Sequence, residues 1–177
     1  MLRHIAWFNE APVAPRPEGG LASPDELVCR RCLVPARAIE VLGVGCSVFG
    51  NLGEADPAHV SQHLQKLNAD IVVIGEISEP MRLKLARAAK HLGCYVVADF
   101  GAEERDKDAL LHLMQVADQA VAATQAIAMN LEKAGVKALV IPGCEEKNTV
   151  ATEAAARLWL ECFKQLKLRP PAGANQN

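Results

Sequence analysis

Short continuous apolar runs alternate with longer segments of helical periodicity along most of the chain. The clearest runs are residues 70–74 (DIVVI) and 95–98 (YVVA), each bounded by polar residues or glycine. Such runs are typical of strands buried on both faces, as in a parallel sheet. Between them, apolar residues of the segment 80–92 recur at helical spacing, with Ser78 as the expected N-cap and Gly93 at the end. This stretch predicts one βαβ unit.

The flanking sequence repeats the same plan. The expected strands are residues 3–8, 44–49, 70–74, 95–98, 118–122 and 137–141, and the expected helices are 23–42, 58–67, 80–92, 109–116, 125–133 and 149–166. Pro35 lies inside the first helix, so a kink is expected there. The pattern predicts an α/β fold: a single doubly wound, mostly parallel, Rossmann-like sheet in one domain over residues 1–168, with a disordered tail at 169–177.

In an open parallel sheet, ligands bind outside the carboxyl ends of the strands. Asp99 ends one predicted strand and Glu76 follows another. Either carboxylate could serve as a base or contact an acceptor hydroxyl, and we name both as catalytic candidates. The alternative is that each carboxylate simply caps the loop that follows it.

Candidate anion contacts lie near the start of the chain. Arg30 and Arg31 are close to a predicted helix N-terminus, where a guanidinium can bind phosphate or carboxylate, although a solvated helix face explains them equally. Gly19 and Gly20 lie in a proline-rich loop after the first strand and could allow close approach of a phosphate. The loop lacks both common phosphate-binding glycine motifs, so a plain surface loop is the alternative.

Composition narrows the class of partner. A formal net charge of -2 and an aromatic content of 4% argue against nucleic acid. No apolar run approaches the roughly 18 residues of a membrane span, and the N-terminus does not read as a signal peptide, so a cytoplasmic protein is expected.

The six cysteines are expected to be reduced and mostly structural. Cys29 and Cys32 form a C-x-x-C pair, which leaves a thiol-redox role open. A metal site would need a second pair, and the spacing of His59 and His63 is a weak signal. We therefore expect neither a metal nor a cofactor.

Five stretches, in their order and spacing, carry a family resemblance over about residues 3–146. They are CRRCLVPARA at 29–38, ADIVVIG at 69–75 with SEP at 78–80, CYVVAD at 94–99, ADQAVAAT at 117–124 and VIPG at 140–143. Together they resemble the N-terminal, acceptor-side domain of GT-B glycosyltransferases, the group 1 or family four enzymes. The second domain of such enzymes, which holds the nucleotide-sugar donor, has no counterpart here.

The resemblance implies a glycosyltransferase-like single domain that binds a small polar, sugar-like or nucleotide-sugar ligand at the strand ends. Asp99 and Glu76 would be catalytic, and the ligand-binding set would be Arg31, Arg30, Gly19, Gly20, Ser78 and Thr124. A separate donor-domain partner would complete the enzyme. Two alternatives stay open: a non-catalytic interaction module that acts as a homodimer or with a partner protein, and a small redox protein that uses Cys29 and Cys32.

Overall fold

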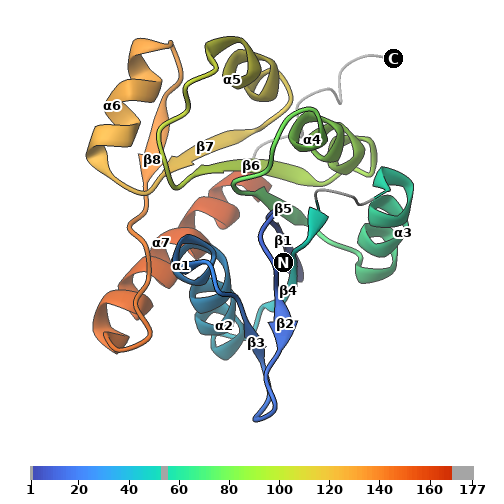
Figure 1. Cartoon of the computed structure of the whole chain (residues 1–177), viewed down its shortest axis with the longest axis vertical. Helices are drawn as coiled ribbons and strands as arrows, with labels where there is room; N and C mark the ends of the chain where they lie inside the picture. Colours follow the sequence, from blue (N-terminus) through green and yellow to red (C-terminus); the bar gives the residue numbers. More distant parts are fainter. Residues whose placement is uncertain (1, 53–55, 169–177) are drawn as a thin grey trace.

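The computed structural model describes residues 2–52 and 56–168. Its centre is a six-stranded sheet in which every neighbouring pair of strands is parallel (Figure 1). The strands are β1 (His4–Phe8), β4 (Gly45–Phe49), β5 (Ile71–Ile74), β6 (Tyr95–Phe100), β7 (Gln119–Ala122) and β8 (Ala138–Val140). The order across the sheet is β4-β1-β5-β6-β7-β8.

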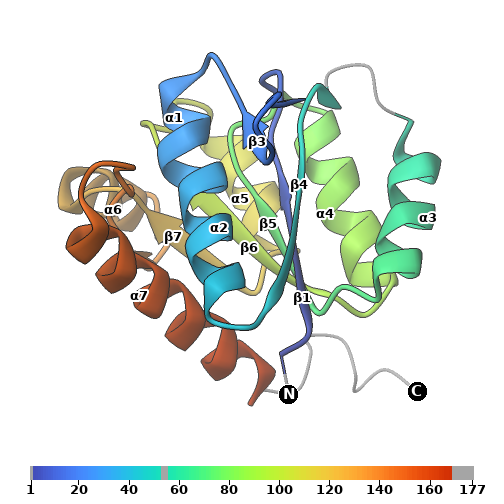
Figure 2. The ribbon, with the colours of Figure 1, turned by 90° about the horizontal axis from the view of Figure 1, so that it is seen from below.

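Helices cover both faces of the sheet, as Figure 2 shows. One face packs against α1 (Glu26–Val28), the π-helix η1 (Cys29–Leu33), α2 (Val34–Val41) and α7 (Thr149–Lys167). The other face packs against α3 (Pro57–Leu67), α4 (Met81–His91), α5 (Lys107–Met114) and α6 (Gln125–Lys133). No helix within the described ranges is long and apolar enough to cross a membrane.

This arrangement confirms the predicted doubly wound α/β fold. Counted by appearance in the six-stranded sheet, the strand order is 2-1-3-4-5-6, which is the flavodoxin-like order with one more strand at the edge. The chain leaves β1 for β4 on one side and then returns to β5 on the other side. The order therefore reverses between β1 and β5, and this switch point is where such sheets bind ligands. The predicted tail at 169–177 lies outside the described residues.

The first helical segment differs from its prediction in two ways. The helix was expected from residue 23, but it begins at Glu26 with Asp25 as its N-cap, whose carboxylate accepts a hydrogen bond from the Val28 N–H at 3.1 Å. The expected kink at Pro35 takes the form of a π turn just before it, where the Val34 N–H donates to the carbonyl of Cys29. Because proline cannot donate a hydrogen bond, the wider turn falls where the regular helical ladder is interrupted.

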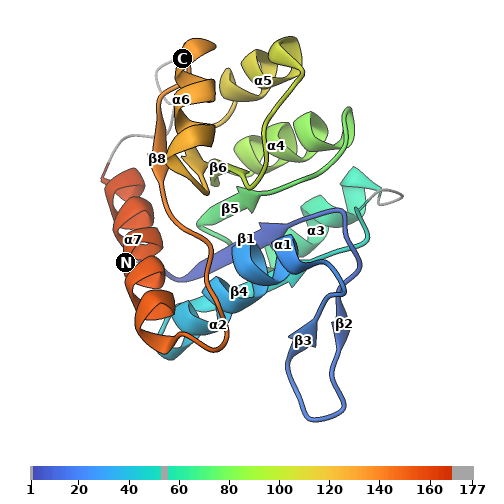
Figure 3. The ribbon, with the colours of Figure 1, turned by 60° about the vertical axis from the view of Figure 1, so that its left-hand side comes forward.

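A small hairpin interrupts the loop that was expected to be irregular. Strands β2 (Ala14–Pro15) and β3 (Leu21–Ala22) pair antiparallel and project away from the sheet (Figure 3). Gly19 and Gly20 form the tip of the hairpin with φ of +98° and +81°, values that glycine adopts without strain. The two glycines therefore have a turn-forming role.

An aromatic cluster joins the sheet to α7. The rings of Trp7 on β1 and Trp159 on α7 meet edge to face with centroids 5.0 Å apart, and Phe163 stacks on Trp159 at 5.5 Å. All three side chains are fully buried. Burial of aromatic surface of this size holds the last helix against the sheet.

Candidate functional site

The switch point carries a groove of about 430 Å³ at the carboxyl ends of β1 and β5. A volume of this order falls within the range of small-molecule pockets. The lining comes from the loops after β1, β5 and β6 and from the first turns of α4 and α5. The residues are Glu10, Glu76, Ile77, Ser78, Glu79, Arg82, Glu104, Asp106 and Ala109.

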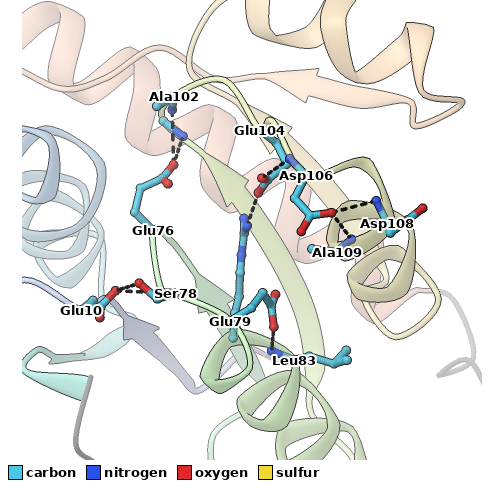
Figure 4. A network of polar contacts seen from close by, with 12 residues as sticks. Glu10, Glu76, Ser78, Glu79, Leu83, Ala102, Glu104, Asp106, Asp108 and Ala109 are labelled. Atoms are coloured by element: carbon cyan, nitrogen blue, oxygen red, sulfur yellow. Dashed lines mark hydrogen bonds and ion pairs between the residues drawn. The ribbon is translucent and has the colours of Figure 1, made fainter.

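Glu10 ties the loop after β1 to the loop after β5. Its Oε2 accepts hydrogen bonds from the Ser78 N–H at 2.8 Å and from the Ser78 hydroxyl at 2.6 Å (Figure 4). Ser78 was expected to cap the following helix, and this expectation is wrong. The N-cap position of α4 is Pro80, which makes no side-chain capping bond, because the serine hydroxyl is engaged by Glu10.

Glu76 bridges β5 to the loop after β6. Its Oε1 accepts hydrogen bonds from the backbone N–H groups of Gly101 at 3.1 Å and Ala102 at 3.3 Å (Figure 4). Burial raises the pKa of Glu76 above its ordinary value, while the Arg82 charge and the two backbone hydrogen bonds oppose the rise. Glu76 thus holds the loop after β6 with one carboxylate oxygen and also lines the groove.

Arg82 is the positive charge of this groove. It is only 4% exposed, its Nη1 donates to Glu104 Oε2 at 2.6 Å, and its guanidinium lies 4.8 Å from the centroid of the Phe100 ring. Its buried Nε and Nη2 atoms find no hydrogen-bond acceptor in the described part of the chain. The charge of Arg82 is balanced by Glu104.

The groove is therefore strongly acidic. Five carboxylates line it against one guanidinium. Most of them use one oxygen to hold a loop or helix start, as Glu79 does for the Leu83 N–H and Asp106 does for the first turn of α5. Within residues 2–52 and 56–168, Glu10 Oε1, Glu76 Oε2 and Glu79 Oε1 accept no hydrogen bond. These oxygens are free for a ligand.

Arg31 and Asp99 form a buried pair behind the groove. Nε and Nη2 of Arg31 donate to the two oxygens of Asp99, and Nη1 donates to the carbonyl of Ile141. The side chains are 5% and 3% exposed, and the guanidinium lies 5.4 Å from the Trp159 ring centroid. Burial raises the pKa of Asp99, against the opposing charge of Arg31. The structure thus brings together two of the predicted site residues, and their side chains bind each other.

A second, smaller cavity lies beside the groove. Its volume is about 20 Å³, and it is lined by Asn9, Leu27, Val28, Arg31, Cys32, Val73, Gly75, Glu76, Asp99 and Gly101. A volume of this order holds about one water molecule. Glu76 lines both the cavity and the groove.

Asn9 lines this cavity and has one buried polar atom without a partner among the described residues. The residue is 2% exposed, and its Nδ2 donates to the Phe49 carbonyl at 3.0 Å and approaches Cys32 Sγ at 3.9 Å. Its Oδ1 is buried and has no hydrogen-bond donor among the described residues. An acceptor left unpaired in the interior is costly.

The other predicted ligand-binding residues lie elsewhere. Arg30 forms surface ion pairs with Glu26 and Glu145. Thr124 caps α6, accepting from the Ile127 N–H at 3.2 Å. Gly20 lines a different groove of about 540 Å³ beside β4.

Sequence reasoning did not name Asn9, Arg82 or four of the five carboxylates of the groove, which are Glu10, Glu79, Glu104 and Asp106. Asn9 and Glu10 directly follow β1, which is the position where the topology argument places site residues. Arg82 gave no such signal, because a single arginine in the first turn of a helix reads as solvated.

The six cysteines are free thiols. Burial raises the pKa of Cys32 far above its ordinary value, and the pKa values of Cys94 and Cys144 rise to about 11 for the same reason. In the described ranges, no three His, Cys, Asp or Glu side chains are grouped so as to hold a metal ion.

Comparison with known proteins gives a likeness among solved structures only. No protein-family model matches the chain, and no curated protein matches it. Among solved structures, the crystal structure of diflavin flavoprotein A3 from Nostoc sp. matches over 95% of this chain and 97% of that chain, with 18% identity and a TM-score of 0.41. A likeness this weak assigns no function to the chain.

The resemblance to GT-B glycosyltransferases does not hold: no family model matches the chain, and the solved structure named above is a flavoprotein. The glycosyltransferase-like function falls with it. The motifs misled because apolar strands with a polar terminal residue recur in any doubly wound sheet. CRRCLVPARA, for example, forms a π turn whose Arg31 is bound to Asp99. The interaction-module and thiol-redox alternatives gain no better support, and a buried Cys32 with a raised pKa disfavours thiolate chemistry.

Proposed function

We propose that this chain is a small-molecule-binding domain whose ligand is an organic cation held at the switch point between β1 and β5. The observation that carries the proposal is the acidic groove, where five carboxylates face one guanidinium already paired with Glu104. A groove lined by one sign of charge attracts the opposite charge. An ammonium group donates hydrogen bonds, which is what the unused carboxylate oxygens accept.

The donor pattern favours an organic cation over a metal ion. A hard metal needs several oxygens converging on one point. The carboxylates of this groove are instead spread over three loops, and none of the described acidic residues are grouped for a metal. The ammonium groups of a flexible amine can each donate hydrogen bonds to a different carboxylate.

Flavin mononucleotide, which flavodoxin-like folds hold at this switch point, does not fit the residues here. A phosphate needs N–H donors or cations, but the loop after β1 brings Glu10 and three prolines at 12, 15 and 17. Glu79, across the groove, adds a further negative charge. The phosphate of a nucleotide would meet repulsion at the same place.

The test is a thermal-shift measurement of the full chain with putrescine, a diamine, and with flavin mononucleotide. At 100 times its dissociation constant, putrescine should stabilise the fold by about 2.7 kcal/mol, or about 5–10 °C in Tm for a chain of this size. The shift should shrink in 0.3 M salt because screening weakens charge attraction.

Variants locate the binding. Glu76→Gln/Glu79→Gln should reduce the putrescine shift, whereas Glu153→Gln, on an exposed part of α7, should leave it intact. No shift with putrescine, an equal loss in the Glu153 variant, or stabilisation by flavin mononucleotide would each contradict the proposal.

Two finer expectations remain predictions beside this one. A homodimer should show twice the chain mass by light scattering. A cytoplasmic location should be visible by fractionation of cells that express the chain.

A further inference from the structure

We infer that the free edge of β4 is a docking groove for an extended peptide segment whose side chains alternate between apolar and acidic. The strand ends the six-stranded sheet on one side and lies between α2 and α3 (Figure 2). A groove of about 540 Å³ follows it, and none of the residues of this groove lines the acidic groove at the switch point. The inference is therefore independent of the proposed function.

The backbone of β4 is available along this edge. The Gly45 N–H and the Phe49 carbonyl form hydrogen bonds with the residues that flank β1. Because the N–H and C=O groups of successive residues in a strand point to opposite sides, Cys46 and Val48 direct theirs away from β1. None of the described strands pairs with β4 on that side. Four backbone groups can thus form hydrogen bonds with an added strand.

The strand β4 lacks the features that usually protect a sheet edge. Its sequence, GCSVF, contains neither proline nor a charged residue. All five residues are partly exposed, whereas strands β5 and β6 are wholly buried. The opposite edge strand, β8, has only three residues, and a short edge is a poor template for pairing. The longer, uncharged edge of β4 is therefore the one suited to strand addition.

The walls of the groove favour a single strand over the edge of a second folded copy. Residues 46–49 of β4 all line the groove, although successive side chains of a strand point to opposite faces of the sheet. The groove therefore wraps around the strand edge, between one wall from α2 and another from α3. In a second copy the same two helices would flank β4 and would meet these walls before the strands could pair. An isolated extended segment has no such helices.

The two walls differ in their chemistry. The wall from η1 and α2 is apolar at Leu33 and Ala36, and its two charged residues are of opposite sign. The wall from α3 contributes His63 and Lys66, both exposed, and no acidic residue. Because the side chains of an added strand alternate between the faces, one set would meet the apolar wall and the other the basic wall. Acidic side chains suit the basic wall.

The experiment measures the binding of two labelled, capped peptides to the full chain by fluorescence polarisation. The peptide EVEVEVE has the expected alternation, and TVTVTVT has the same valines with a neutral β-forming residue in place of glutamate. The acidic peptide should bind about 3- to 10-fold more tightly, because its carboxylates face the α3 wall. Equal binding, tighter binding of TVTVTVT, or binding of neither peptide would overturn the inference.

Two variants locate the binding. Val48→Pro removes one outward N–H and places a ring at the open edge, while the hydrogen bonds to β1 involve the neighbouring residues. It should weaken both peptides at least about 10-fold. Lys66→Glu should weaken EVEVEVE about 3- to 10-fold and leave TVTVTVT unchanged. Lys84→Glu, at an exposed position of α4 outside the groove, should change neither peptide.

Circular dichroism shows whether Val48→Pro folds, and if it does not, the two lysine variants decide the question alone. Retained binding in folded Val48→Pro, or an equal loss in Lys66→Glu and Lys84→Glu, would overturn the inference. A chain mass that is doubled by light scattering and becomes single in Val48→Pro would also overturn it, because a second copy would then occupy the edge. None of these results depends on whether putrescine binds.

Discussion

The buried Arg31–Asp99 pair makes a strong prediction about stability. Asp99→Ala removes both oxygens that the guanidinium binds, but it leaves the guanidinium buried beneath Trp159. One hydrogen bond, to the carbonyl of Ile141, remains. The substitution therefore strands a charge in a site that excludes water.

Breaking a buried pair by removing one partner costs about 3–5 kcal/mol. The structure supports this range, because the two side chains are only 5% and 3% exposed and lose two hydrogen bonds at once. Domains are stable by about 5–15 kcal/mol, so the loss is a large fraction of the total. For a chain of this length it corresponds to a fall in Tm of about 6–20 °C.

The assay is urea unfolding followed by circular dichroism, with the free energy taken from the midpoint and slope. Arg30→Ala is the matched control, since this neighbouring arginine makes only exposed ion pairs and should cost less than about 1 kcal/mol. The double variant Arg31→Met/Asp99→Leu should recover most of the stability, because apolar replacements of a buried pair are often neutral.

Two results would refute this reasoning. A cost below about 1 kcal/mol for Asp99→Ala would mean that the pair is solvated rather than buried. Additive costs of the two single substitutions in a double-mutant cycle would mean that the residues do not interact.

Other predictions concern pH, reactivity and packing. Burial would raise the pKa of Asp70, but hydrogen bonds from Lys167 and from two backbone N–H groups outweigh burial and lower the pKa. The protein should therefore be more stable than Asp70→Asn by the full amount above about pH 4. This difference in the free energy of unfolding should disappear as the pH falls below that value. Iodoacetamide should label Cys29 in the folded protein and Cys32 only after unfolding, as mass spectrometry can show, because Cys32 is buried and its pKa is raised. Gly50→Ala should cost about 1–3 kcal/mol in thermal unfolding, since its Cβ would lie 2.6 Å from a carbonyl oxygen of the loop after β1.

The strands and helices could be predicted because their signals are local. The runs DIVVI and YVVA show continuous apolarity, and strands β5 and β6 form there in the expected parallel pairing. The order of strands was beyond reach, because no local pattern tells whether a crossover passes left or right of β1. That order determines which loops meet at the switch point.

The site was less predictable, since its properties come from tertiary contacts. Ser78 has the sequence position of a cap, but Glu10, 68 residues earlier, binds its hydroxyl. Asp99 has the position of a strand-end base, but Arg31 of η1, 68 residues earlier in the chain, donates a hydrogen bond to its carboxylate. Neither pairing leaves a trace in local sequence. Glu76 was named correctly as a strand-end carboxylate near the groove, whereas its ligand-binding role remains a prediction.

The π turn between α1 and α2 sets the rotational phase of the two helices. One residue of a regular α-helix advances the direction of its side chain by about 100°. The wide turn at Cys29–Leu33 takes up one residue more than a regular turn. Residues seven positions apart on a regular helix differ in direction by only about 20°, whereas residues eight apart differ by about 80°. The extra residue of the wide turn therefore lets Arg31 and Ile39, eight positions apart, both face the core. One further residue inserted after the turn would rotate α2 by about 100° and turn Ile39 away from the sheet.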